Sequence, residues 1–420
     1  LAQEVDETEV FPRVTVEKMA KAGFMGIPIP KEYGGQGADV LTYAMCVEEL
    51  SKVCGTTGVI VSAHTSLCCD PILTFGTEEQ KQKYLVPLAK GEKLGAFGLT
   101  EPGAGTDAQG QQTKAVLDGD EWVLNGSKIF ITNGKEADVY VIFAVTSVVT
   151  DAKGRSKKMI SAFIVEKGTP GFTFGTKENK MGIRGSSTYE LIFTDCRIPK
   201  ENLLGQEGKG FGIAMHTLDG GRIGIAAQAL GLAEGALDRT IAYVKERKQF
   251  GRAIGAFQNT QFQLADMATK VQAAQYMVYR AAMAKATQKS YTVEAAMAKL
   301  YAAEVAMEVT TKAVQLHGGT AHDLENDIHS ALFAVVTGHG QGDTLAVLKR
   351  TYNDELTRLC LLGDQRGFND HLCHGGVQRD LFSDLIHRVC SFMLTFPSPR
   401  TKTRAGLQGV GAAFLYDLLT

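Results

Sequence analysis

A glycine-rich stretch near residue 100 combines small residues with ionisable side chains, as many ligand-binding loops do. It reads Thr100-Glu-Pro-Gly-Ala-Gly-Thr-Asp107. Its glycines would let backbone N–H groups approach a phosphate or a planar ring closely, but Pro102 and Gly103 are equally typical of an ordinary β-turn. Glu101 and Asp107 could form an acid–base pair, although such residues more often cap turns. The stretch alone leaves these alternatives open.

Two other glycine-rich segments and a histidine cluster give weaker signals. The segments at 208–212 and 338–342 read GKGFG and GHGQG. Neither is a GxGxxG that follows a strand, so no Rossmann-type dinucleotide site is predicted. His371, Cys373 and His374 lie close together, but their spacing fits no zinc pattern. We expect no metal site.

The composition is that of an ordinary globular protein, with 420 residues, a formal net charge of −2 and 44% hydrophobic residues. At about 100–200 residues per domain, two to three domains are expected. The near-neutral charge argues against a nucleic-acid binder, and no apolar run reaches the roughly 18 residues of a membrane span. The 8 cysteines include no CxxC pair, which favours a reducing, intracellular compartment.

The predicted secondary structure changes along the chain from helical to β-rich and back to helical, which indicates an α+β fold. Residues 1–92 are typical of a helical domain, residues 93–205 of a compact antiparallel β-barrel or sandwich, and residues 206–319 of a helical bundle. Residues 320–420 form a divergent tail, because the helical alanine periodicity stops there and most of the histidines follow.

Periodicity and turn signals predict particular elements within these domains. Apolar residues at helical spacing predict helices over 40–53, 264–281 and 293–316. Thr77, followed three residues later by Gln80, is a capping box that opens a helix running through Leu88. Asn125-Gly126 separates two β-rich runs and predicts a hairpin turn.

Several short motifs occur in the order and at the separations of one enzyme family. They are Ala96-Phe-Gly-Leu-Thr-Glu-Pro-Gly-Ala-Gly-Thr-Asp107, Lys128-Ile-Phe-Ile-Thr-Asn-Gly134, Leu218-Asp-Gly-Gly-Arg222, Glu246-Arg-Lys-Gln-Phe-Gly251 and Gln315-Leu-His-Gly-Gly319. Together they resemble the acyl-CoA dehydrogenases, flavoproteins with an N-terminal helical domain, a middle β-barrel and a C-terminal four-helix bundle, which would be incomplete here. The segments at 62–67 and 110–114 are most similar to the short-chain, butyryl-type members. The resemblance covers about residues 1–319.

The resemblance implies FAD as the cofactor and assigns residues to it. Phe97, Leu99 and Thr100 would lie beside the flavin, Phe130 and Thr132 would flank its ring, and Gly105 and Thr106 would meet the junction of FAD and acyl-CoA. Arg247 and Phe250 would reach the FAD of a neighbouring subunit, with Arg247 on the pyrophosphate. The further FAD contacts that it implies are Gln258, Gln315, Gly318 and Gly319.

The implied activity is the dehydrogenation of a short-chain acyl-CoA to the trans-2-enoyl product. Thr106, Asp219 and Arg222 would bind the acyl-CoA, and electrons would pass to electron-transferring flavoprotein. A residue that crosses to a second subunit requires at least a homodimer, and the family is usually homotetrameric. We expect a bacterial cytoplasmic enzyme, or a mitochondrial matrix enzyme if the source is eukaryotic.

The sequence departs from the family at the catalytic base, so the catalytic residue stays unknown. The family's Tyr-Glu-Gly motif is missing after Gly319, and an ungapped count from Gly318 places the base position at Gly342. Some members carry the base immediately before the Arg of the Leu-Asp-x-x-Arg motif, and that position is Gly221. Nearby acidic residues are poor substitutes, namely Asp343, Glu325 and Asp354.

Two interpretations of this departure stay open. In one, the residues after Gly319 come from a shifted reading frame, a wrong exon join or a fusion, and the source enzyme is an ordinary dehydrogenase. In the other, the chain is a divergent homologue that binds FAD and acyl-CoA without dehydrogenating, or that uses another base. Losing a general base costs about 10²–10⁴ in rate, so either interpretation predicts a weakly active or inactive chain. A third possible function within the same fold is that of a flavin oxidase or monooxygenase.

Overall fold

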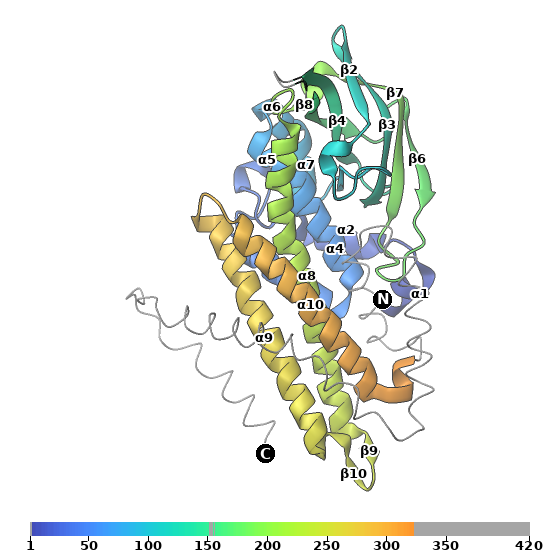
Figure 1. The fold of residues 1–420 in the computed structure, drawn as a ribbon, viewed down its shortest axis with the longest axis vertical. Coiled ribbons are helices and arrows are strands. Elements are labelled where there is room, and N and C mark those ends of the chain that lie inside the picture. Colours follow the sequence, from blue (N-terminus) through green and yellow to red (C-terminus); the bar gives the residue numbers. More distant parts are fainter. Residues whose placement is uncertain (1, 151–153, 155, 323–420) are drawn as a thin grey trace. The chain divides into compact units, whose positions relative to one another are not determined.

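Helices, then strands, then helices again follow one another along the chain. The computed structural model describes residues 2–150, 154 and 156–322 (Figure 1). Strands β1–β8 lie between the N-terminal helices and the long helices α8, α9 and α10. This order confirms the predicted α+β class.

Short helices make up the N-terminal part. They are α1 (Ala2–Thr8), α2 (Arg13–Lys21), α3 (Val40–Val53), α4 (Gly55–Ser62), α5 (Asp70–Phe75), α6 (Glu78–Gln80) and α7 (Val86–Ala89), with 3₁₀ turns η1 (Phe24–Gly26) and η2 (Lys31–Tyr33) and π-helical turns η3 (Ala63–Cys69) and η4 (Lys81–Leu85). Helix α3 has the predicted bounds and is capped by Asp39, whose Oδ1 accepts from the Thr42 amide at 2.7 Å. The capping box of Thr77 and Gln80 is present, so this prediction is confirmed.

Helices α4 and α5, joined by η3, form one continuous apolar segment at the centre of the structure. By length and hydropathy Gly55–Phe75 would suit a membrane span, but 67% of its most apolar 18-residue window is buried inside the protein. It packs against β1 and α8, and Asn133 donates to the carbonyl of Ile60 at 3.3 Å. The segment therefore has the packing of a core helix.

Eight strands form one sheet in the order β6-β7-β3-β2-β4-β5-β8, with β1 beside β4. They are β1 (Gly95–Gly98), β2 (Lys114–Asp118), β3 (Glu121–Thr132), β4 (Val139–Thr150), β5 (Ser156–Glu166), β6 (Phe172–Lys177), β7 (Thr188–Pro199) and β8 (Leu203–Leu204). Most neighbours are antiparallel, as predicted, but β1 and β2 pair with β4 in parallel. The β2–β3 hairpin lies between β1 and β4 in the chain and supplies the long crossover that a parallel pair requires.

The predicted hairpin turn at Asn125-Gly126 is wrong. Both residues lie inside β3, and the β2–β3 hairpin turns between Asp118 and Glu121, which pair with each other. Gly126 has a φ of +143° and sits at a register shift between β3 and β7. The glycine therefore serves a β-bulge, where the strand needs a conformation that other residues rarely adopt.

The first part of β4, residues 139–145, is buried on both faces and links two hydrophobic clusters. Val141 and Phe143 pack into a cluster with Leu85 and Leu88 of the N-terminal helices. The alternate residues, such as Tyr140, pack into a second cluster within the sheet that includes Trp122, Phe163, Phe172 and Phe193. Because successive side chains of a strand point to opposite faces, β4 packs against the N-terminal helices on one face and within the β domain on the other.

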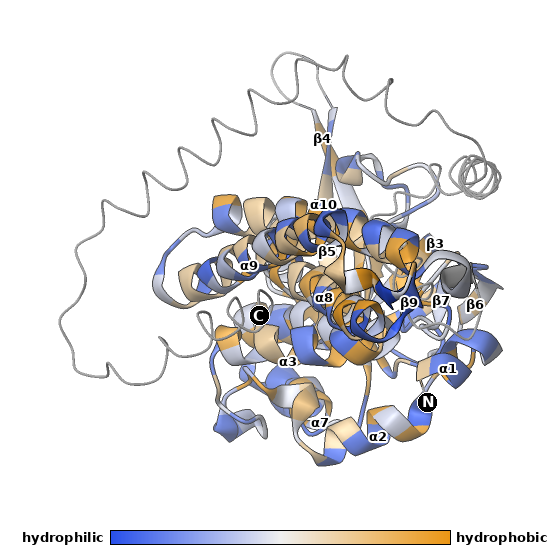
Figure 2. Cartoon of the chain, turned by 90° about the horizontal axis from the view of Figure 1, so that it is seen from below, coloured by the Kyte–Doolittle hydropathy of each residue, from blue (hydrophilic) through white to orange (hydrophobic). Residues whose placement is uncertain are grey.

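Three long helices dominate the described C-terminal part, namely α8 (Gly210–Glu246), α9 (Gln258–Thr287) and α10 (Thr292–His317). The predicted helices over 264–281 and 293–316 lie within α9 and α10 and are confirmed. Figure 2, seen along these helices, shows α8 enclosed by α3, α9 and α10, all of which contact it. A small hairpin of β9 (Lys248–Gln249) and β10 (Arg252–Ala253) follows α8 at the end opposite the sheet (Figure 1).

Glycines let α8 approach α3 and α4 more closely than side chains would allow. A Cβ at Gly231 would overlap the carbonyl oxygen of Glu48, and one at Gly235 would overlap that of Lys52. At Gly224 a Cβ would lie 2.5 Å from the Tyr43 hydroxyl. Glycine weakens an isolated helix by up to about 1 kcal/mol per residue, but here close packing offsets that cost.

We expect Gly231→Ala to destabilise the protein by about 2–4 kcal/mol, because the added methyl forces α8 away from the α3 backbone. Urea unfolding of the purified protein measures this change. The matched control is Gly212→Ala on the same helix, where a Cβ meets nothing within 4 Å and stability should hold or rise by up to about 1 kcal/mol. Equal midpoints for the two variants would contradict the close-packing explanation.

Candidate functional site

The loop after β1 and the irregular part of β3 lie side by side. The Ile129 amide donates to the carbonyl of Thr100 at 2.9 Å, and the Asn133 side chain donates to the carbonyl of Gly95 at 3.2 Å. Phe97 on β1 is half-buried and packs edge-on against Phe143, with ring centroids 5.1 Å apart. Residues predicted from two separate motifs therefore meet in one place, which we call the loop cluster (Phe97, Leu99, Thr100, Phe130 and Thr132).

Phe130 is the most unusual member of the loop cluster. It lies where the β3–β7 register shifts, has a φ of +59°, and leaves 42% of its surface exposed. A bulky residue held at positive φ costs on the order of 1–3 kcal/mol and persists only where its surroundings impose it. The strain presents an aromatic ring at the surface, which is the arrangement expected of a ligand-binding residue.

Two hydroxyl groups accompany this ring. Thr100 and Thr132 are both half-buried, and within the described residues neither hydroxyl has a hydrogen-bond partner. Each hydroxyl can donate one hydrogen bond and accept others. An apolar ring beside free hydroxyls suits a planar heteroaromatic ligand with a polar edge.

Glu101 is engaged in the interior and is not available as a base. Its Oε1 accepts from Lys128 Nζ at 2.7 Å and from the Thr113 amide at 3.1 Å, and its Oε2 accepts from the Gln112 amide at 2.5 Å. Although burial alone would raise it, the charge of Lys128 and these amides hold the pKa of Glu101 below its usual value. The structure thus excludes the acid–base pair of Glu101 and Asp107 and assigns Glu101 a structural role.

The outer part of the same loop is open. Gly105 and Thr106 are exposed, and a Cβ at Gly105 would meet nothing within 4 Å. The packing of the described chain therefore does not require a glycine there. Space next to the backbone is what close approach of a ligand would need.

The remaining predicted cofactor residues gather at the far end of α8, where we call them the hairpin cluster (Arg247, Phe250, Gln258, Gln315, Gly318 and Gly319). Arg247 ends α8, Gln258 begins α9, and Tyr243 connects to the end of α10 by donating to the carbonyl of His317 at 3.2 Å. Phe250 has a φ of +52° and is 93% exposed. All six residues are exposed in the part of the chain that the structure describes.

The two clusters lie near opposite ends of α8. Helix α8 contains 37 residues, which is about 55 Å at 1.5 Å per residue. Its first residue, Gly210, packs against Ser161 and Ala162 of β5, while the hairpin cluster lies beyond its last residue (Figure 1). The loop cluster is on the sheet side of this separation.

Family profiles match three successive parts of the chain. Profiles of the acyl-CoA dehydrogenase N-terminal, middle and C-terminal domains match residues 1–92, 96–196 and 208–338. The short-chain specific acyl-CoA dehydrogenase of Clostridium acetobutylicum is 64% identical over 319 residues, which are 76% of this chain and 83% of that protein. The chain belongs to the acyl-CoA dehydrogenase family.

Solved structures of high sequence identity have the same acyl-CoA dehydrogenase fold. Butyryl-CoA dehydrogenase from Megasphaera elsdenii superposes with a TM-score of 0.78 at 49% identity, over 85% of this chain and 93% of that one. A structure reported for the electron transferring flavoprotein of Acidaminococcus fermentans gives 0.78 at 56% identity, over 85% and 92%. The predicted family and fold are thereby confirmed.

The two residues that the family resemblance assigns to CoA lie one turn apart on α8. Arg222 and Asp219 form an ion pair of 2.6 Å, and the Thr292 hydroxyl donates to the other Asp219 oxygen at 2.6 Å. Asp219 therefore ties α8 to the first turn of α10 and orients the half-exposed Arg222. The assignment of both residues to CoA stays a prediction.

The family's alternative base position is a glycine in a tight space. Gly221 is buried in α8, and a Cβ there would lie 2.7 Å from Leu67 Cδ2 and 4.0 Å from Ser66 Oγ of η3. The other positions considered for the base, Glu325, Gly342, Asp343 and Asp354, lie outside the described residues, as do His371, Cys373 and His374. Position 221 offers no proton acceptor.

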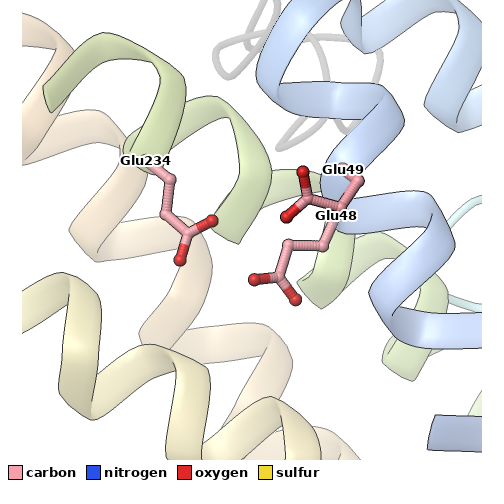
Figure 3. Close-up of side chains that lie close together, drawn as sticks. All are labelled: Glu48, Glu49 and Glu234. Atoms are coloured by element: carbon pink, nitrogen blue, oxygen red, sulfur yellow. The ribbon is translucent and has the colours of Figure 1, made fainter. Parts of the chain in front are cut away.

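A carboxylate cluster lies between α3 and α8, away from both clusters. Figure 3 shows Glu48 and Glu234 pointing toward one another with Glu49 beside them, and their oxygens come within 4.8 Å of one another. Lys52 Nζ lies 2.7 Å from Glu49 and 2.9 Å from Glu234, so an ammonium group already supplies the positive charge. Gln275 of α9 donates to Glu48 and Glu234 at 3.1 and 3.2 Å. This is a packing contact between helices.

We expect Glu234→Gln to stabilise the protein above neutral pH by about 1–3 kcal/mol. Burial and the neighbouring Glu48 raise the pKa of Glu234 to about 7, despite Lys52. The folded state then binds a proton that the unfolded state releases, so this carboxyl makes stability fall as pH rises from about 4.5 to 7. Urea unfolding at pH 5 and pH 8 should show the gain only at pH 8.

Glu308→Gln is the control, for which we expect a change in stability of the opposite sign. Against the effect of burial, Lys270 and Lys312 lower the pKa of Glu308, so its removal should destabilise at neutral pH, and the loss should shrink in acid. A Glu234→Gln variant that loses stability at pH 8 would refute the buried-repulsion explanation.

Lys128 is the site residue whose role the sequence did not reveal. It stands in the Lys128–Gly134 motif, yet only the structure shows that its side chain is fully buried, with an exposed fraction of 0%. A lysine within a β-rich run could have signalled a buried partner, since charged groups enter the interior only when paired. The partner itself was not predictable.

Proposed function

We propose that this protein is an FAD-dependent short-chain acyl-CoA dehydrogenase. It converts a short-chain acyl-CoA to the trans-2-enoyl-CoA. The observation that carries the proposal is the loop cluster, in which a strained, exposed phenylalanine shares one region with two threonines whose hydroxyls have no hydrogen-bond partner among the described residues. Membership of the acyl-CoA dehydrogenase family gives these residues their chemistry.

The residues present fit FAD. Phe130 offers a ring face for a flavin, and Thr100 and Thr132 offer hydrogen bonds to its polar edge. The guanidinium of Arg247 suits the pyrophosphate, because it can bind phosphate through two parallel hydrogen bonds. When bound, FAD supplies the hydride acceptor that the removal of an α-proton and a β-hydride requires.

The separation of the clusters supports a homodimer or homotetramer. The hairpin cluster of one subunit completes the cofactor site of its partner, since α8 holds the two clusters too far apart for one FAD in one subunit. The nearly fully exposed Phe250 then becomes a contact between subunits.

Thr106, Asp219 and Arg222 bind the acyl-CoA in this proposal. The Asp219–Arg222 ion pair presents a guanidinium at the surface of α8, which suits the phosphates of CoA. The electron acceptor is an electron-transferring flavoprotein, in line with the similarity to the Acidaminococcus structure. The bacterial cytoplasm is the proposed location, in line with the Clostridium relative.

A second candidate function is a homologue that binds FAD and acyl-CoA without catalysis. It is favoured by Gly221, which occupies a family base position and carries no side chain. Without a base the chain would retain binding and lose about 10²–10⁴ in rate.

Anaerobic titration of the FAD-supplemented protein with butyryl-CoA tests both candidates. We expect bound flavin whose visible absorption shifts on substrate binding and then bleaches slowly. Rapid, complete bleaching would establish the dehydrogenase with a base of its own. Flavin that binds and never bleaches would establish the second candidate, and a protein that takes up no FAD would refute both.

A further inference from the structure

The ammonium group of Lys128 lies directly beneath the loop cluster. Lys128 Nζ donates to the carbonyl of Leu99 at 3.2 Å, to Glu101 Oε1 at 2.7 Å and to Gln111 Oε1 at 3.1 Å. An ammonium has three hydrogens to donate, so this group is fully satisfied. Its acceptors come from both ends of the loop that carries Gly105 and Thr106.

Glu101, the other member of the ion pair, also holds the two ends of this loop together. Its carboxylate accepts the amides of Gln112 and Thr113, immediately before β2 begins. Glu101 also exchanges backbone hydrogen bonds with Ala104, at 3.2 and 3.0 Å. One buried ion pair thus holds residues 99–101 and 111–113 together, and the open part of the loop extends between them.

Stability alone gives a weak reason for such a pair. Burying both charges costs about as much as their attraction returns, so apolar replacements of a buried pair are often neutral or stabilising. Burial lowers the pKa of Lys128 to about 8, against the opposing effect of Glu101, so the ammonium stays charged at neutral pH. What the pair provides beyond energy is a fixed geometry.

We propose that Lys128 and Glu101 are positioning residues, whose ion pair fixes the 99–113 loop in the conformation that presents Thr100 and Thr106 to the cofactor and the acyl-CoA. The inference rests on the proposed function for the identity of these ligands. Neither side chain touches the ligand, because both are buried. Leu99 transmits the effect of Lys128, since it accepts its hydrogen bond and adjoins Thr100.

The test compares Lys128→Met, Glu101→Gln and the double variant. Each single variant leaves one buried charge unpaired and should lower the melting temperature of the apoprotein, whereas the double variant should recover most of that loss. All three should bind FAD at least about 10-fold more weakly than the unmodified protein, because misplacement of about 1 Å in a site costs up to about 10²-fold. Fluorescence quenching of FAD measures this affinity.

Hydrogen exchange of the apoprotein gives a readout that needs no ligand. The amides of Gln112 and Thr113 should exchange slowly in the unmodified protein and faster in the double variant. A double variant with unmodified FAD affinity and unmodified exchange would overturn the proposal. If the unmodified protein binds no FAD, the proposed function fails, while the exchange rates still decide whether the pair clamps the loop.

Lys158→Met keeps the test decisive if the double variant does not fold. Lys158 Nζ donates to the carbonyls of Gly110 and Gln111 at 2.9 and 2.8 Å from outside the ion pair. Its loss should weaken FAD binding about 3-fold and lower the melting temperature only modestly, because two hydrogen bonds from a charged donor are removed while the ion pair stays intact; unchanged affinity would count against the proposal. Lys167→Met is the matched control, since Lys167 Nζ donates to the backbone carbonyl of Lys135 elsewhere in the β domain.

Discussion

Mixing two variants that each bind FAD only weakly should regenerate about a quarter of the normal flavin sites. The variants are Phe130→Gly in the loop cluster and Arg247→Ala in the hairpin cluster. Random pairing in a twofold interface makes half of the dimers mixed, and each mixed dimer has one intact site and one doubly defective site. Bound flavin per subunit, measured after co-expression with two different tags, tests this expectation.

Neither substitution should unfold the subunit. Glycine accepts the positive φ of Phe130 without strain, and Arg247 is exposed at the end of α8. Each variant alone should bind FAD on the order of 10²-fold more weakly, as expected for the loss of a charge-assisted contact or a stacking ring.

A pair of variants within one cluster provides the control. Arg247→Ala mixed with Phe250→Ala should regenerate no site, because both defects fall on the same side of the interface. If Phe130→Gly and Arg247→Ala also fail to complement each other, the two clusters do not serve a shared cofactor, and the proposed assembly is wrong.

Periodicity predicted the helices whose apolar side chains lie on one face. Helix α3 and the cores of α9 and α10 follow a 3.6-residue repeat of apolar residues, which depends on local sequence alone. Helix α8 escaped prediction as a single element although it is the longest described helix. Its glycines, among them Gly221, Gly224 and Gly231, argue locally against a helix, and only their contacts with η3, α4 and α3 explain them.

In the β domain, too, local sequence could not predict a feature that depends on a distant contact. Asn125-Gly126 and the segment between Asp118 and Glu121 are both good turn signals, since each combines Gly with Asn or Asp. The choice between them depends on β7, where Asn125 Oδ1 accepts from the Asp195 amide at 2.8 Å. That partner lies far away in the sequence, so local chemistry could not select the true turn.

The candidate site was predictable where the motifs are contiguous. Resemblance placed Thr100 and Phe130 in one site, and the hydrogen bond between Ile129 and Thr100 brings their segments together. It did not reveal that Glu101 is locked by Lys128, nor that Leu67 fills the space in front of Gly221. Both are contacts between residues on different elements, far apart in the sequence. A single sequence gives no direct information on such contacts.

A carboxylate introduced at position 221 should speed the bleaching of bound flavin by butyryl-CoA about 10²–10⁴-fold, provided that Leu67 is shortened. The variant is Gly221→Glu combined with Leu67→Ala. A general base contributes a rate factor of this size, and some family members carry their base at this position. Stopped-flow absorbance under anaerobic conditions measures the rate.

Leu67 is the side chain nearest to a new residue at position 221. A Cβ at Gly221 lies 2.7 Å from Leu67 Cδ2, the end of a side chain that can rotate, so Gly221→Glu alone requires Leu67 to move and should cost about 1 kcal/mol of stability. Replacing Leu67 with alanine removes the obstructing atoms. Leu67→Ala alone should leave bleaching slow, because it adds space without a proton acceptor.

Gly221→Gln with Leu67→Ala separates base catalysis from a change of shape. Glutamine has the size of glutamate but cannot accept the α-proton, so this variant should bleach as slowly as the unmodified chain. The bleaching rate of the glutamate variant should rise with pH as its carboxyl ionises, whereas that of the glutamine variant should not. Equal rates for the two would show that space, and not a base, limits this chain, and the search for its catalytic residue would then move away from α8.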